Sequence, residues 1–93
     1  MEKVERVETK EKRLAYLAEE IHSWRDEVYA LRHDLFNLKA ERREVTDLET
    51  FRGYDTRVRS IKLQIPVLQG RIRALQHEHD SLKDELQHPR PPP

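Results

Sequence analysis

Apolar residues recur at alternating spacings of three and four through most of this chain. A repeat that averages 3.5 residues keeps one narrow stripe of a helix facing a partner helix as the two supercoil. The pattern therefore predicts an all-α coiled coil held together by an oligomerisation seam. That seam comprises Leu14, Leu17, Ile21, Trp24, Val28, Leu31, Leu35, Leu38, Val45, Val58, Ile61, Ile65, Leu68, Ile72, Leu75, His79, Leu82 and Leu86.

The composition suits a narrow seam better than a compact core. Only 35% of the 93 residues are hydrophobic, whereas 39% are charged. Lys+Arg and Asp+Glu number 18 each, so no net charge draws the chain toward nucleic acid or a membrane surface. Cysteine is absent, and no stretch approaches the roughly 20 apolar residues of a membrane span. We expect no membrane insertion and an intracellular, cytoplasmic or cytoskeletal location.

The chain divides into two predicted helical segments, residues 1–50 and 57–87. Between them, residues 51–56 contain Gly53, and Asp55 or Thr56 could cap a new helix. The heptad frame also shifts by two residues across this segment, which neither a single stutter nor a single stammer produces. We therefore expect a break near residues 50–57. Pro66 should kink the second helix, and residues 88–93 should form an extended Pro-rich tail.

Charges beside the seam favour a parallel homodimer over an antiparallel helical hairpin. A hairpin that turns near Asp55 would place Asp34 beside Glu78 and Glu27 beside Glu85, and both pairs repel. A parallel, in-register dimer makes four orientation-setting pairs that all attract: Glu20 with Arg25, Glu27 with Arg32, Asp34 with Lys39, and Glu78 with Lys83.

The core residue types point to the same arrangement. β-Branched residues fill most a positions and leucine most d positions, a combination typical of two parallel strands. Arg42 falls at an a position, where a two-stranded seam lets its long side chain reach solvent. The alternative, a hairpin alone or paired into a four-helix bundle, stays open because Gly53 and Pro66 weaken a single straight rod.

Two seam residues depart from the aliphatic pattern. His79 at an a position could form a pH-sensitive joint or half of a zinc site, but two imidazoles are too few ligands for a structural metal. We interpret His79 as a polar residue that helps to set register. Trp24 is large for a two-stranded core and could anchor a partner; we expect it to pack partly outside the seam. No metal site and no cofactor are predicted.

Two further features suggest binding. Basic residues surround the expected break, and as a tip they could grip phosphates; they are Arg52, Arg57, Arg59, Lys62, Arg71 and Arg73. Pro89 and Pro92 form a minimal P-x-x-P element that an SH3-like groove could accept. No catalytic residue is predicted, because Ser23, Ser60 and Ser81 lack a converging base and acid.

These features predict a non-enzymatic coiled-coil element for scaffolding and protein association. Its expected partner is a second copy of itself or another coiled-coil protein. Two alternatives remain: a nucleic-acid-binding helical hairpin that uses the basic region 52–73, and a subunit of a heteromeric coiled coil.

Overall fold

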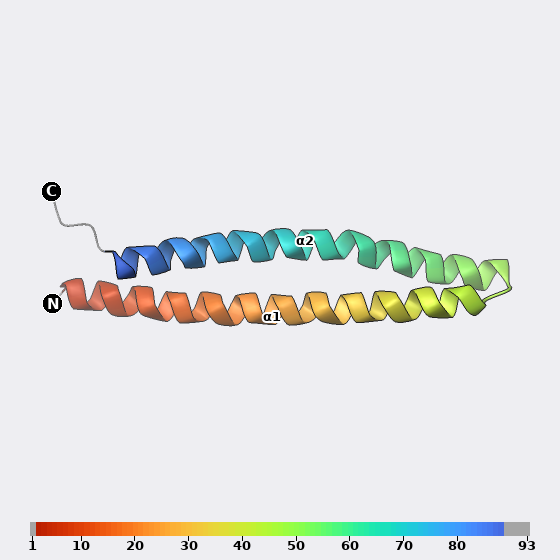
Figure 1. Cartoon of the computed structure of the whole chain (residues 1–93), viewed down its shortest axis with the longest axis horizontal. Coiled ribbons are helices and arrows are strands. Elements are labelled where there is room, and N and C mark those ends of the chain that lie inside the picture. The colour runs from red at the N-terminus through yellow and green to blue at the C-terminus, as the bar shows by residue number, and fades with distance from the viewer. Residues whose placement is uncertain (1, 89–93) are drawn as a thin grey trace.

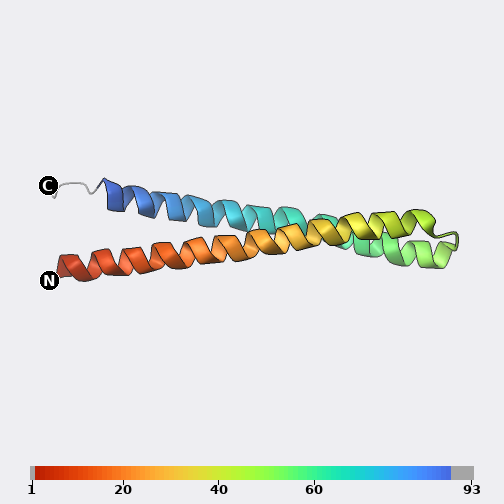
Figure 2. The same ribbon diagram turned by 60° about the horizontal axis from the view of Figure 1, so that its bottom comes forward.

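The protein is a helical hairpin, seen in a computed structural model that describes residues 2–88, with side chains described from residue 9. Helix α1 spans Glu2–Glu44 and helix α2 spans Leu48–Gln87. The two run antiparallel, so the start of α1 and the end of α2 lie at the same end of the rod (Figure 1). The rod measures 70 × 19 × 15 Å. Turning the view shows that the helices wind around each other between the open end and the turn (Figure 2).

The prediction of an all-α protein built from two long helical segments is confirmed. Of the two arrangements considered, the chain adopts the antiparallel hairpin in place of the favoured parallel dimer. The break also lies earlier than expected. Residues 45–47 connect the helices, and residues 51–56 form regular turns of α2.

A side-chain cap at Asp47 explains the position of the turn. Its backbone is extended, with φ −87° and ψ 129°, and its carboxylate accepts hydrogen bonds from the Thr50 N–H at 3.0 Å and the Thr50 hydroxyl at 2.9 Å. An N-cap aspartate satisfies N–H groups that the first turn of a helix leaves without partners. Gly53, in contrast, sits inside α2 with open space where a Cβ would project. The cap, rather than the glycine, ends one helix and begins the next.

The earlier turn changes every pairing between the helices. Glu78 now lies beside Arg13 instead of Asp34, and Glu85 lies 3.4 Å from Lys10 instead of beside Glu27. Pairs expected to repel are thereby replaced by pairs that attract. The longer α2 also reaches the start of the seam, where Leu17 is buried. The charge argument against a hairpin was therefore wrong because it assumed a turn near Asp55.

The predicted seam lines the contact between α1 and α2. Each of its residues is buried or half-buried, and the most deeply buried are Leu17, Ile21, Val28, Leu38 and Val58. The use of this stripe between chains stays a prediction, because here it joins two helices of one chain. The Pro-rich tail, residues 89–93, lies outside the described residues.

Helix α2 continues through Pro66 without interruption (Figure 1). The side chain of Pro66 is exposed, so its ring meets solvent rather than α1. Proline costs one backbone hydrogen bond, but on the outer face water can take the freed carbonyl. Helix α2 is therefore not broken at Pro66, and the kink expected there stays a prediction. Within the described residues, neither helix is apolar enough over its length to cross a membrane.

Candidate interaction surfaces

Three shallow grooves run along the sides of the hairpin, where α1 and α2 meet. One groove, of about 470 Å³, lies on the side formed by Arg25, Val28, Tyr29 and Arg32 of α1 and Gln69, Ile72 and Arg73 of α2. We name it the arginine groove. The other two lie on the opposite side and share Ser60.

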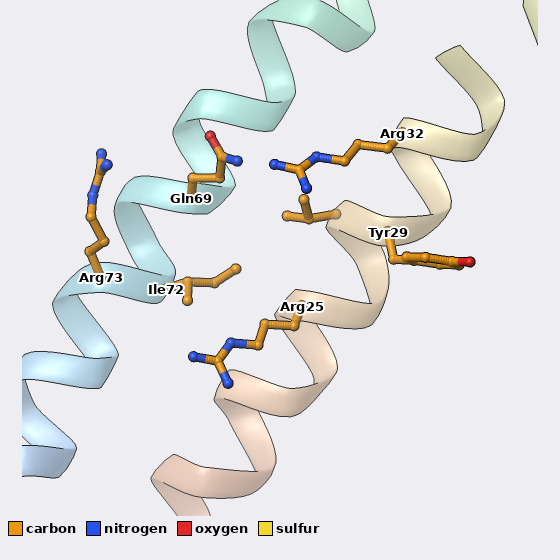
Figure 3. Close-up of a pocket in the computed structure, with 7 residues that line it drawn as sticks. Arg25, Tyr29, Arg32, Gln69, Ile72 and Arg73 are labelled. Carbon is orange, nitrogen blue, oxygen red and sulfur yellow. The ribbon is translucent and has the colours of Figure 1, made fainter. Parts of the chain in front are cut away.

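The arginine groove has an apolar floor and basic walls. Figure 3 shows the side chains of Arg25 and Arg32 reaching from α1 toward α2, while Gln69 and Ile72 point back toward α1. Arg73 and Tyr29 extend from the outer edges of the two helices. Arg25 donates a hydrogen bond to Gln76 at 3.1 Å. Along the described part of the chain, none of the ion pairs includes Arg25, Arg32 or Arg73.

More basic and aromatic side chains continue this side of the hairpin toward the turn. Lys39 follows Arg32 by seven residues and Lys62 precedes Gln69 by seven, so the helical repeat places both on the same side. Two aromatic rings are unusually exposed for their size, Tyr29 at 77% and Phe36 at 72%. They are also seven residues apart. We name this surface the basic flank; it comprises Arg25, Tyr29, Arg32, Phe36, Lys39, Lys62 and Arg73.

The opposite side, which we name the mixed flank, carries an apolar pair. Leu63 is 73% exposed and Val67 is 67% exposed, and they are neighbours on α2 because they lie four residues apart. Together with Ser60, Gln64, Leu68 and Glu27 they line a groove of about 370 Å³. Toward the turn, a second groove of about 460 Å³ brings Asp34 and Glu41 of α1 near Arg57 of α2.

Charges on the mixed flank alternate in sign between the two helices. Near the turn α1 is acidic and α2 is basic, as Asp34, Glu41 and Arg57 show. Near the open end the signs exchange, because Arg13 of α1 pairs with Glu78 of α2. The hydrogen bond from Arg13 to Glu78 raises the pKa of Arg13 further above its ordinary value. At both ends, therefore, each helix faces a charge opposite to its own.

The eight charges predicted to set orientation are divided between the two flanks. Arg25 and Arg32 line the arginine groove, and Lys39 lies on the same flank. Glu27 and Asp34 line the two opposite grooves, and Glu78 binds Arg13. The remaining two are Glu20, which is half-buried, and Lys83, which is exposed and helps to lower the pKa of Asp80. The pairs proposed between parallel chains stay a prediction, because the structure describes a single chain.

Trp24 and His79 lie where the two helices meet. Trp24 is half-buried, and the Arg71 guanidinium stands over its ring, 4.7 Å from the centroid. A cation held against an indole face is stabilised by the ring's negative charge density. The His79 Nδ1 lies 3.2 Å from a carboxylate oxygen of Asp80. That contact, followed by the hydrogen bond from Gln76, lowers the pKa of Asp80.

The basic cluster expected at the tip does not form one surface. Arg71 packs on Trp24, Arg59 pairs with Asp55 at 3.0 Å, and Arg57 lies in a groove with two carboxylates. Lys62 and Arg73 belong to the basic flank, and Arg52 is exposed without an ion pair among the described residues. Reasoning from sequence missed this flank because its residues come from two helices whose alignment depends on the turn. The spacing of Arg25, Tyr29, Arg32, Phe36 and Lys39 along one face was the available signal.

Ser23, Ser60 and Ser81 are all exposed. No three histidine, aspartate or glutamate side chains of the described segment come together as a site for a metal ion. Comparison with known proteins found no matching family model, no similar curated protein and no similar solved structure.

Proposed function

We propose that this chain is a non-enzymatic association module whose hairpin pairs with a second copy through the mixed flank. The product is an antiparallel four-helix bundle. The observation that carries the proposal is the exposed pair Leu63 and Val67 beside a groove, on the flank where the two helices carry opposite charges. Burial of these side chains would remove apolar surface from water, at about 25 cal/mol per Å².

The charges support one particular arrangement of the two copies. A rotation of 180° about the long axis of the rod places α1 of one hairpin against α2 of the other at the same level. Asp34 and Glu41 then face Arg57 of the second copy, and Arg13 faces its Glu78. Each of these contacts is attractive and each occurs twice, as a twofold interface requires.

A four-helix bundle also suits the dimensions of the hairpin. Two helices form a rod only 19 × 15 Å across, and such a rod cannot enclose residues outside the seam. Four-helix bundles pack nearly antiparallel helices with short connections, as the turn at 45–47 provides. Scaffolding is part of this proposal, because a bundle of two hairpins presents the outer surfaces of both in one assembly.

Sedimentation velocity tests the proposal. We expect the wild-type chain to sediment at twice its 11.2 kDa mass, and a Leu63→Gln, Val67→Gln variant to sediment as a single chain with unchanged helicity. The matched control is Tyr29→Gln, Phe36→Gln, which removes two equally exposed apolar side chains from the other flank and should remain dimeric. Equal dissociation of both variants would contradict the proposal. A wild-type chain that is monomeric would instead favour docking of a helix from a different protein.

A further inference from the structure

We infer that the basic flank binds single-stranded nucleic acid, with its arginines on the phosphates and its exposed rings stacked on bases. This surface is separate from the mixed flank and does not depend on the pairing of two hairpins. In the proposed bundle both basic flanks face outward.

The arginines of this flank are chemically available for an anion. Arg25, Arg32 and Arg73 surround one groove, and no carboxylate of the described residues pairs with any of them. Three other arginines of the described residues are engaged in ion pairs: Arg13 with Glu78, and Arg42 and Arg59 with Asp55. A guanidinium matches the geometry of phosphate oxygens with two parallel N–H donors, and it is weakly hydrated. Three such groups without counter-charges attract a polyanion to this groove.

A net charge of zero does not prevent the basic flank from attracting nucleic acid, because acidic residues line the opposite flank. Net charge is zero, yet Glu27, Asp34 and Glu41 line the grooves of the opposite flank. The residues that line the arginine groove include three arginines and no carboxylate, so the charge around the groove is positive. Binding of nucleic acid responds to charge within about one Debye length, about 8 Å at physiological salt, rather than to the total.

The exposed aromatic rings favour a single strand over other polyanions. Tyr29 and Phe36 alternate with Arg25, Arg32 and Lys39 along one face of α1 (Figure 3 shows the first part of this row). Seven residues of helix separate the two rings, or about 10 Å along the axis. Bases of a single strand are free to stack on such rings, whereas those of a duplex are not. An acidic peptide would use the arginines but would leave Tyr29 and Phe36 in water.

Fluorescence anisotropy with a labelled oligothymidylate of about 20 nucleotides, longer than the flank, tests the inference. The key variant replaces Arg25, Arg32 and Arg73 with glutamine. The control replaces Lys10, Lys12 and Arg71, which are exposed and lie outside the arginine groove, and it removes the same charge. We expect the groove variant to lose at least tenfold in affinity and the control less than threefold. Three phosphate contacts should also give the wild type a slope near −2 in log K against log salt, which the groove variant loses.

A second pair of variants isolates the stacking. Tyr29→Ala should weaken binding by about tenfold, the typical effect of removing one base-stacking ring. Tyr16→Ala removes a ring of similar exposure from the other side of α1 and should have no effect. Equal losses from the groove and control variants, or no binding at low salt, would overturn the inference. Displacement of the oligonucleotide by polyglutamate at equal charge concentration would also overturn it and would identify an acidic protein as the ligand.

The Leu63→Gln, Val67→Gln variant separates this inference from the proposed pairing. If the single hairpin binds the oligonucleotide, the basic flank acts without the bundle. If binding is lost together with pairing while the arginines are intact, the site is not on the basic flank of one hairpin and the inference fails.

Discussion

The carboxylate of Asp55 lies 2.9 Å from Nη1 of Arg42, and this ion pair joins the last turn of α1 to the second turn of α2. The other oxygen of Asp55 lies 3.0 Å from Nε of Arg59, and the Arg42 guanidinium stands 5.7 Å from the centroid of the Phe51 ring. The sequence predicted that the side chain of Arg42 would reach solvent from a dimer seam. In the structure it forms an ion pair that closes the turn of the hairpin.

Removal of the Asp55 charge should destabilise the hairpin. Because Arg42 and Asp55 are half-buried, the hydrogen bond between their charged groups is shielded from water, and we expect Asp55→Asn to lower the free energy of unfolding by about 1–2 kcal/mol. The control is Asp26→Asn, where an exposed carboxylate meets only His22 at 3.5 Å and the change should stay below about 0.5 kcal/mol. Urea unfolding followed by circular dichroism measures both. Equal effects would show that the Arg42–Asp55 pair does not hold the turn.

Two proline variants locate the break between the helices. Leu48 is the first residue of α2, its side chain is exposed, and Asp47 before it is already extended, so Leu48→Pro should be nearly neutral. Gly53→Pro introduces the same ring in the interior of α2 and should cost about 3 kcal/mol or more. Thermal melts of the two variants give the comparison. If Leu48→Pro were instead the more destabilising of the two variants, the break between the helices would lie within residues 51–56, as predicted from the sequence.

Gly53→Ala should stabilise the protein. An added Cβ meets nothing within 4 Å, and no glycine of the described residues has a positive φ. Alanine in an exposed helix interior is favoured over glycine by about 0.5–1 kcal/mol because it loses less backbone entropy on folding. The midpoint of urea unfolding should rise accordingly. A fall would mean that Gly53 needs a conformation closed to alanine.

Because of the Asp47 cap, the stability of the protein should fall at acidic pH. The Thr50 N–H, and then its hydroxyl, donate to the Asp47 carboxylate and lower its pKa. A group with a lowered folded pKa contributes stability above its unfolded value, about 3.9 for aspartate, and that contribution disappears as the pH falls through the folded pKa. Asp47→Asn keeps an accepting oxygen but cannot titrate. The advantage of wild type over this variant should therefore be present at pH 6 and diminish as the pH falls below the unfolded value of about 3.9. Melting temperatures across that range test it, and a constant difference would contradict the role of the charge.

A single cysteine distinguishes the hairpin from a parallel rod. Leu31 lies half-buried on the stripe between α1 and α2, so Leu31→Cys should not form a disulfide between chains under mild oxidation. In a parallel, in-register dimer the two cysteines would face each other and crosslink rapidly. Gel electrophoresis without reductant gives the answer. A strong band at twice the chain mass would contradict the antiparallel fold.

The periodic pattern was sufficient to predict which residues lie between the helices, from Leu14 to Leu86. It was not sufficient to predict what they face, because an a/d stripe is equally apolar against a neighbouring chain and against the same chain. The decisive residues were Asp47 and Thr50, a local cap without the conspicuous signal of Gly53. Once the turn was placed near Asp55, Glu78 was assigned to the wrong partner and the charges misled. The spacing of Arg25, Tyr29 and Arg32 indicated the α1 side of the arginine groove, but its α2 side could not be predicted without the alignment of α1 with α2.

The open end of the hairpin has a mechanical consequence. Side-chain hydrogen bonds between the helices range from Arg42 with Asp55, 13 residues apart, through Arg25 with Gln76, 51 apart, to Arg13 with Glu78, 65 apart. Tension applied at the two ends that lie side by side would load these contacts one after another, starting with the most distant in sequence. The molecule would therefore open like a zipper at low force and would close again from the turn, instead of resisting as a rod sheared along its length.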